Sequence, residues 1–87
     1  MKSFLLTASS PDGNLFQGQV YQLILRGSEG DLAIMPGHIP FMTAVMPGVC
    51  RIILPDGSER VARTDGGLLS VAEDGVTLLS ESFRWAE

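Results

Sequence analysis

Residues 48–64 read GVCRIILPDGSERVART, and this stretch decides the fold class. Two short runs flank Pro55-Asp56-Gly57, and in the first of them every second side chain (Cys50, Ile52 and Leu54) is apolar. This tripeptide is typical of a tight turn, because proline presets φ, aspartate bonds to the nearby backbone and glycine accepts a positive φ. The pattern therefore predicts a β-hairpin with arms at 48–54 and 58–64.

Similar turn signals divide the rest of the chain into short strands. Pro11-Asp12-Gly13 follows a first strand at 3–9, and Gly18 is expected to bend or bulge the long run at 15–26 into two strands. Further strands are expected at 31–35, 41–46, 68–71 and 76–80. Turn signals about every 8 to 12 residues are typical of a β-sandwich or barrel. We therefore predict one all-β domain over residues 1–87.

The C-terminal residues 80–87 fit no single pattern. Phe83 and Trp85 are candidates to pack back on the sheet. No segment of the chain shows a convincing helical period, so nothing here changes the all-β prediction.

The charge balance argues against nucleic acid as a partner. Six Lys and Arg residues stand against ten Asp and Glu residues, which gives a net charge of −4. The basic residues are scattered, whereas nucleic-acid binding needs them clustered. No apolar run approaches the ~18 residues of a membrane-spanning helix, and the N-terminal apolar run is too short for a signal peptide. We expect a soluble, cytoplasmic chain that reaches a membrane only through a partner.

The residues that could carry chemistry are few. Cys50 is the only cysteine and His38 the only histidine. Cys50 shares a wholly apolar strand face with Ile52 and Leu54, so we expect it in the core, where burial raises the thiol pKa and makes it inert. A Cys-His hydrolase is therefore the weakest alternative. One histidine with distant carboxylates supplies too few ligands for a metal.

Nucleotide binding is not expected either. The chain contains neither of the glycine-rich phosphate-binding motifs that end in a helix. Gly66-Gly67 stands between two expected strands, where it predicts a tight backbone crossing rather than a phosphate site.

Residues 27–41, GSEGDLAIMPGHIPF, are the strongest candidate for a binding site. Three glycines and two prolines fix the backbone path, and Met35 at a turn tip is difficult to bury in a small domain. Exposed apolar side chains of this kind mark interfaces. Core burial stays an equal alternative for Phe41 and Met42. His38 either bonds within the turn or reaches a partner.

An ordered set of short motifs runs nearly from end to end of the chain. The set comprises Phe16-x-Gly18-x-Val20, Gly27-Ser28-Glu29-Gly30-Asp31-Leu32, Pro36-Gly37-His38-x-Pro40, Thr43-Ala44-x-x-Pro47-Gly48-Val49, Arg51-Ile52, Asp56-Gly57-Ser58-Glu59, Gly66-Gly67-x-Leu69-x-Val71 and Val76-Thr77-x-Leu79. Together they resemble the N-terminal domain of the epsilon subunit of rotary F-type ATP synthase, called delta in mitochondria. The resemblance implies a flattened ten-stranded β-sandwich of two sheets with no catalytic activity of its own.

The resemblance also implies partners and contact residues. The partners are the gamma subunit and the c-ring, with no cofactor, metal or small-molecule ligand. The residues that match the c-ring contact are Glu29, Gly30, Asp31, Met35, Pro36 and Gly37. Those that match the gamma contact are His38, Phe41, Met42 and Thr43. The expected location is the cytoplasmic face of a bacterial plasma membrane, reached through the complex. A free-standing β-sandwich protein-binding module that uses the same loop is the alternative.

Three features depart from the family pattern. Asp31 stands where glutamate is commoner, and Asp65 stands where a small uncharged residue is usual. The family's C-terminal helical hairpin, which inhibits ATP hydrolysis and in some members binds ATP, has no counterpart before Glu87. We therefore expect no helical hairpin and assign neither property.

Overall fold

The structure, a computed structural model, describes residues 2–86 and contains ten β-strands and no helix in that range. The strands are β1 (Phe4–Ser10), β2 (Gly13–Val20), β3 (Gln22–Gly27), β4 (Gly30–Ile34), β5 (Phe41–Val45), β6 (Gly48–Ile53), β7 (Glu59–Thr64), β8 (Gly67–Ala72), β9 (Gly75–Ser80) and β10 (Phe83–Trp85). The all-β prediction is confirmed. Within residues 2–86, nothing could cross a membrane as a helix.

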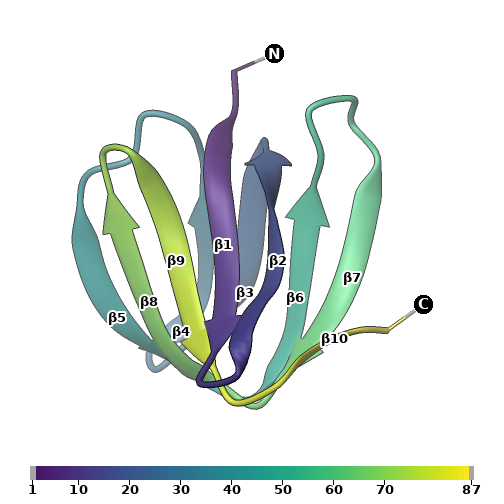
Figure 1. The fold of residues 1–87 in the computed structure, drawn as a ribbon. Helices are drawn as coiled ribbons and strands as arrows, with labels where there is room; N and C mark the ends of the chain where they lie inside the picture. Colours follow the sequence, from purple (N-terminus) through teal and green to yellow (C-terminus); the bar gives the residue numbers. More distant parts are fainter. Residues whose placement is uncertain (1, 87) are drawn as a thin grey trace.

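The strands form one hydrogen-bonded path that folds over on itself. Its order is β10-β7-β6-β3-β5-β8-β9-β1-β2, and β4 pairs with the other side of β3. Strands β3 and β5 meet at a single Cα pair, Gly27 and Val45, so the sheet turns a corner there. Figure 1 shows the resulting nearly closed shape, with β5, β8, β9, β1 and β2 in one layer and β4, β3, β6, β7 and β10 in the other.

The hairpin expected at 48–64 forms from β6 and β7, which pair from Gly48 opposite Thr64 to Ile53 opposite Glu59. The Gly57 amide donates to the Leu54 carbonyl over 2.9 Å, and Gly57 has a φ of +90°. The turn chemistry expected from proline, aspartate and glycine is therefore present.

The core fills the space between the two layers. Its members come from the inward positions of most strands: Phe4, Leu6, Ala8, Val20, Leu23, Leu25, Ile34, Val45, Cys50, Ile52, Ala62, Leu69, Val71, Val76, Leu78 and Phe83. Cys50 and Ile52 are fully buried, as expected, whereas Leu54 is only half-buried at the edge of the core.

The prediction for Gly18 is wrong. Strand β2 runs unbroken through Gly18, which lies opposite Leu6. The register shift falls nearer the turn, where Leu15 is the extra residue, and β2 ends at Val20. Gly18 instead makes room for a side chain, because the Phe16 ring lies 3.3 Å from where a Cβ on Gly18 would be. Its small size serves packing rather than a bend.

The crossing expected at Gly66-Gly67 is present. A Cβ on Gly67 would overlap the Leu79 carbonyl oxygen, and one on Gly66 would lie 2.5 Å from the Val45 carbonyl oxygen. A buried hydroxyl of Thr64 accepts a hydrogen bond from the Gly66 amide over 3.1 Å. Because Gly66 and Gly67 have no side chains, this segment can pass close to the backbone at Val45 and at Leu79.

The C-terminal strand closes the open side of the sandwich. Strand β10 pairs with β7, while the Phe16 ring from β2 packs against Phe83 at 6.5 Å and against Trp85 at 5.4 Å. Arg60 lies over the Trp85 ring, 3.5 Å from its centroid. The expectation that Phe83 and Trp85 pack back on the sheet is confirmed. The aromatic side chains bridge the two ends of the strand path.

Candidate partner-binding surface

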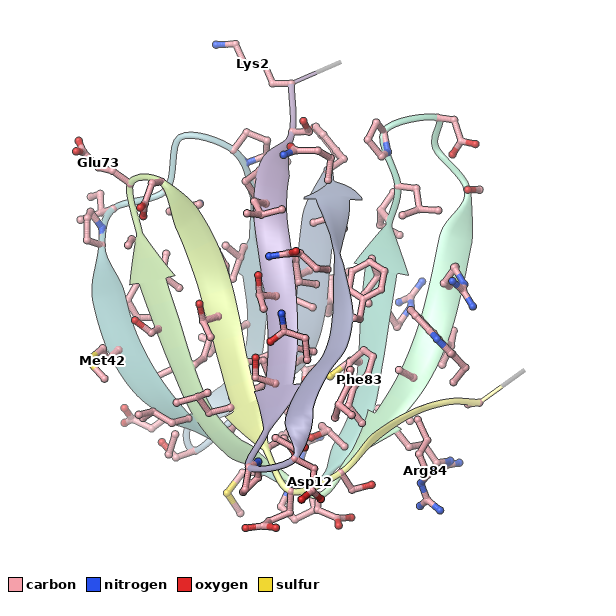
Figure 2. All side chains as sticks on the ribbon, in the orientation of Figure 1. Lys2, Asp12, Met42, Glu73, Phe83 and Arg84 are labelled. Carbon is pink, nitrogen blue, oxygen red and sulfur yellow. The ribbon has the colours of Figure 1, made fainter. Side chains whose placement is uncertain are left out.

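The loop that joins β4 to β5 is exposed, as its composition predicts. Ile39 is 81% exposed and Met35 is 40% exposed. Core burial does not hold for Phe41 or Met42 either, which are 38% and 63% exposed. Figure 2 shows Met42 on the outer side of β5, directed away from the sandwich. A monomer of this size leaves these side chains in water unless a partner covers them.

His38 fixes this loop from inside. The half-buried ring has Nδ1 at 2.8 Å from the Met35 carbonyl oxygen and Nε2 at 2.9 Å from the Ala72 carbonyl oxygen. It also meets the Phe4 ring edge-on at 5.4 Å. A neutral imidazole donates from one nitrogen only, so in either tautomer the ring donates to one of these carbonyls and lies in contact with the other. Of the two roles open for His38, bonding within the fold is the one observed.

The six residues matched to the c-ring do not lie together. Glu29, Gly30 and Asp31 are at the β3–β4 turn, whereas the Met35-Pro36-Gly37 turn follows the other end of β4. A five-residue strand spans about 17 Å. Figure 1 shows the β3–β4 turn and the β4–β5 loop at opposite ends of the sandwich. Met35-Pro36-Gly37 instead lies beside His38 and leads toward β5.

The β3–β4 turn belongs to an acidic end of the molecule. The β1–β2, β7–β8 and β9–β10 connections reach the same end (Figure 1). They carry exposed Asp12, Asp65 and Glu81, which join Glu29 there. Figure 2 shows Asp12 at this lower end. Asp31 pairs with Arg26 at 3.1 Å, an exposed ion pair worth about 0–1 kcal/mol.

No nucleophilic pair forms from the two reactive side chains. Cys50 is fully buried in β6, and burial raises its thiol pKa to about 11. Both ring nitrogens of His38 lie against backbone carbonyls. Residues 2–86 also contain no group of three or more His, Cys, Asp and Glu side chains arranged to hold a metal ion. The exposed side chains of the β4–β5 loop and of the β3–β4 turn offer contact surfaces.

Residues 3–86 match the family described as "ATP synthase, Delta/Epsilon chain, beta-sandwich domain". The chain belongs to this family. The match spans all ten strands, and it agrees with the resemblance drawn from the motifs.

Two solved structures have the same fold as this delta/epsilon chain domain. A chain of the Euglena gracilis mitochondrial ATP synthase structure superposes with a TM-score of 0.88 at 20% identity, over 95% of this chain and 53% of that chain. A chain of the Tetrahymena thermophila mitochondrial ATP synthase central stalk and c-ring gives 0.74 at 13% identity, over 94% and 66%. The present chain thus spans about half the length of the Euglena chain. At these identities the likeness concerns the fold.

Two exposed leucines of this domain were not singled out from the sequence. Leu68 and Leu79 are 37% and 48% exposed on β8 and β9. The signal that could have found them is the two-residue period, because Leu69 and Val71 face the core and Leu68 must then face outward. The signal is hard to see because β8 and β9 carry apolar residues on the outward face as well as on the inward face.

Proposed function

We propose that this chain is a non-catalytic rotor subunit of the central stalk of an F-type ATP synthase. In that role it docks on the gamma subunit and the c-ring and helps to couple ion translocation to ATP synthesis. Membership in the delta/epsilon family supports the proposal. The similar folds come from structures described as ATP synthase assemblies with a c-ring. We assign the chain to the cytoplasmic face of a bacterial plasma membrane, held there through the complex.

The gamma contact is proposed at the β4–β5 loop and the start of β5. The contact residues are His38, Phe41, Met42 and Thr43, with Met35, Pro36 and Gly37 beside them. The observation that carries this assignment is an exposed apolar loop beside a ring whose two nitrogens lie 2.8 and 2.9 Å from backbone carbonyl oxygens. A rotor element must transmit torque without slipping. A stiff apolar loop suits that task, because little conformational entropy is lost when it docks.

The c-ring contact is proposed at the other end of β4. Glu29, Gly30 and Asp31 lie in an exposed turn among the carboxylates of the acidic end. Carboxylates there can pair with basic or amide groups on the ring loops. The two contacts are then separated by the length of β4, so one domain can hold two partners at once.

Titration of purified gamma subunit into this domain, followed by isothermal calorimetry, tests the gamma contact. Met42→Asp places a charge on an exposed side chain and should weaken binding about 30-fold, or ~2 kcal/mol. The matched control is Val49→Asp on β6, because Val49 is also exposed at 40% but lies in the other layer. Its affinity should match the wild type. No binding at micromolar concentrations between two folded proteins would contradict the proposal.

A further inference from the structure

Four exposed arginines lie on the outer face of the layer that contains β3, β6, β7 and β10; they are Arg26, Arg51, Arg63 and Arg84. Two of them have carboxylate partners. Arg26 pairs with Asp31 at 3.1 Å, and Arg51 pairs with Glu59 at 2.6 Å. Neither Arg63 nor Arg84 forms an ion pair with a carboxylate of residues 2–86.

These last two arginines are direct neighbours. Arg63 on β7 lies opposite Arg84 on β10. The adjacent side chains of Ala62 and Phe83 are buried, so both guanidinium groups belong to the outer face. Figure 2 shows Arg84 directed away from the core. Like charges directly opposite each other destabilise a strand pair, and a bound anion would remove that repulsion. We call Arg63 and Arg84 the arginine pair.

The arginine pair is not neutralised by the acidic side chains around it. The chain has ten carboxylate side chains against six basic ones, so carboxylates are plentiful. Asp65 and Glu81 stand near the pair in the sequence, in the connections after β7 and before β10. Neither of them forms an ion pair with it. The arginine pair is therefore open to negative charge from outside the chain.

Apolar surface continues from the arginine pair onto β6. Arg63 lies opposite Val49, whose side chain is 40% exposed. Val49 also lines a groove of about 390 Å³, to which Ile24 and Pro47 add apolar walls. The arginines that line this groove are the two that already have carboxylate partners. Positive charge on β7 and β10 thus adjoins a mainly neutral groove beside β6.

We propose that the arginine pair and this groove bind an acidic segment of a partner protein. Carboxylates of the segment contact Arg63 and Arg84, and an apolar side chain enters the groove beside Val49. A guanidinium group suits this contact because it can donate two parallel N–H···O bonds to one carboxylate. The surface lies in the layer opposite β5, so it is separate from the proposed gamma contact on that strand and goes beyond the proposed function.

The charge of the surface decides the class of partner. Nucleic acids and anionic membranes attract larger basic clusters than two arginines, and the net charge of −4 repels both. The same net charge opposes association with a second copy of the chain. An acidic protein segment needs only one or two carboxylates to match the arginine pair. It also supplies the apolar side chain that the groove can receive.

Two-dimensional ¹⁵N NMR of the full chain tests the proposal. The probe is an acetylated and amidated pentapeptide of alternating glutamate and leucine, and the control peptide has glutamine in place of glutamate. Amide signals at 49, 63 and 84 should shift with the glutamate peptide only. Arg63→Gln and Arg84→Gln should each weaken binding about fivefold. Lys2→Gln is the matched control, because it removes the same charge from an exposed side chain at the opposite end of the molecule (Figure 2).

The spectrum of each variant also reports whether its fold is intact. No shift at 63 and 84 with millimolar glutamate peptide, or equal weakening by Lys2→Gln, would overturn the proposal. Equal shifts with inorganic phosphate would make the pair a site for small anions and overturn it too. Phosphatidylglycerol vesicles that shift the same signals would assign the face to a membrane instead. Shifts that grow with the concentration of the chain alone would assign it to a second copy. The experiment contains no gamma subunit, so its failure leaves the proposed function standing.

Discussion

His38 and Ala72 lie side by side at one end of the paired strands β5 and β8: Nε2 of His38 is 2.9 Å from the Ala72 carbonyl oxygen, although 34 positions separate them in the sequence. The same ring reaches the Met35 carbonyl through Nδ1. The contact ties the β4–β5 loop to the end of β8. The loop that carries the exposed Met35 and Ile39 is thus anchored before any partner arrives.

Replacement of His38 by alanine should loosen this loop. The His38→Ala variant loses contacts to two carbonyls, so amides at 35–41 should exchange with deuterium about tenfold faster, equivalent to ~1.4 kcal/mol. Asn14→Ala is the control, because Asn14 bonds to Ser9 on the exposed surface far from the loop. Equal exchange at 35–41 in all three proteins would show that the ring does not hold the loop.

Burial of Cys50 makes stability fall in alkaline solution. Burial raises the thiol pKa to about 11, so the folded state disfavours the thiolate. The contribution is fully present below about pH 9 and is lost as the pH rises toward about 11, because the unfolded chain releases its proton first. At pH 10, urea unfolding should show about 1 kcal/mol more loss for the wild type than for Cys50→Ala, each relative to pH 8. Parallel pH profiles for the two proteins would contradict the buried thiol.

The crossing at Gly67 should tolerate no side chain. Gly67 has a φ of +151°, and its Cβ would overlap the Leu79 carbonyl oxygen. Gly67→Ala should therefore lower the free energy of unfolding by more than about 2 kcal/mol. Gly57→Ala is the matched variant, because Gly57 also has a positive φ but open space around its Cα. It should cost about 1 kcal/mol. Equal losses in denaturant titrations would argue against a close approach at Gly67.

Trp85 should contribute to closure of the sandwich. The ring packs on Phe16 and Phe83 and lies under Arg60, so Trp85→Ala should destabilise the fold by about 2–3 kcal/mol. Arg84→Ala, an exposed change in the same strand, should stay within about 0.5 kcal/mol of the wild type. Circular dichroism measures both, since the chain has only one tryptophan. If Trp85→Ala were as stable as the wild type, the aromatic packing of β10 would not contribute to closing the sandwich.

The β6–β7 hairpin could be predicted from the sequence because its turn and its inward-facing residues depend on local chemistry. Pro55-Asp56-Gly57 sets its own turn, and the two-residue period of 48–54 sets which side chains face inward, so both could be inferred without distant residues. The β6–β7 pairing agrees with that inference. The same local reading fails at Gly18, because a glycine that serves a neighbouring ring looks like a glycine that bends the chain.

Contacts between segments far apart in the sequence could not be predicted from local patterns. Strand β1 pairs in parallel with β9, and Gly27 meets Val45 at the corner, yet no local pattern marks either pairing. The candidate site shows the same limit. Asp31 and Met35 are close in sequence, but an extended strand carries them to opposite ends of the molecule. His38 lies against Ala72 because β5 pairs with β8, a pairing between distant parts of the sequence.

A cryo-EM structure of the ATP synthase purified through a tag on this chain tests the central claim most directly. The account predicts density for one sandwich domain in the stalk, with Met42 and the β4–β5 loop against gamma and the β3–β4 turn over the c-ring. A purified assembly that contains no gamma and no c-ring, or a stalk-bound domain whose β4–β5 loop faces solvent, would contradict it.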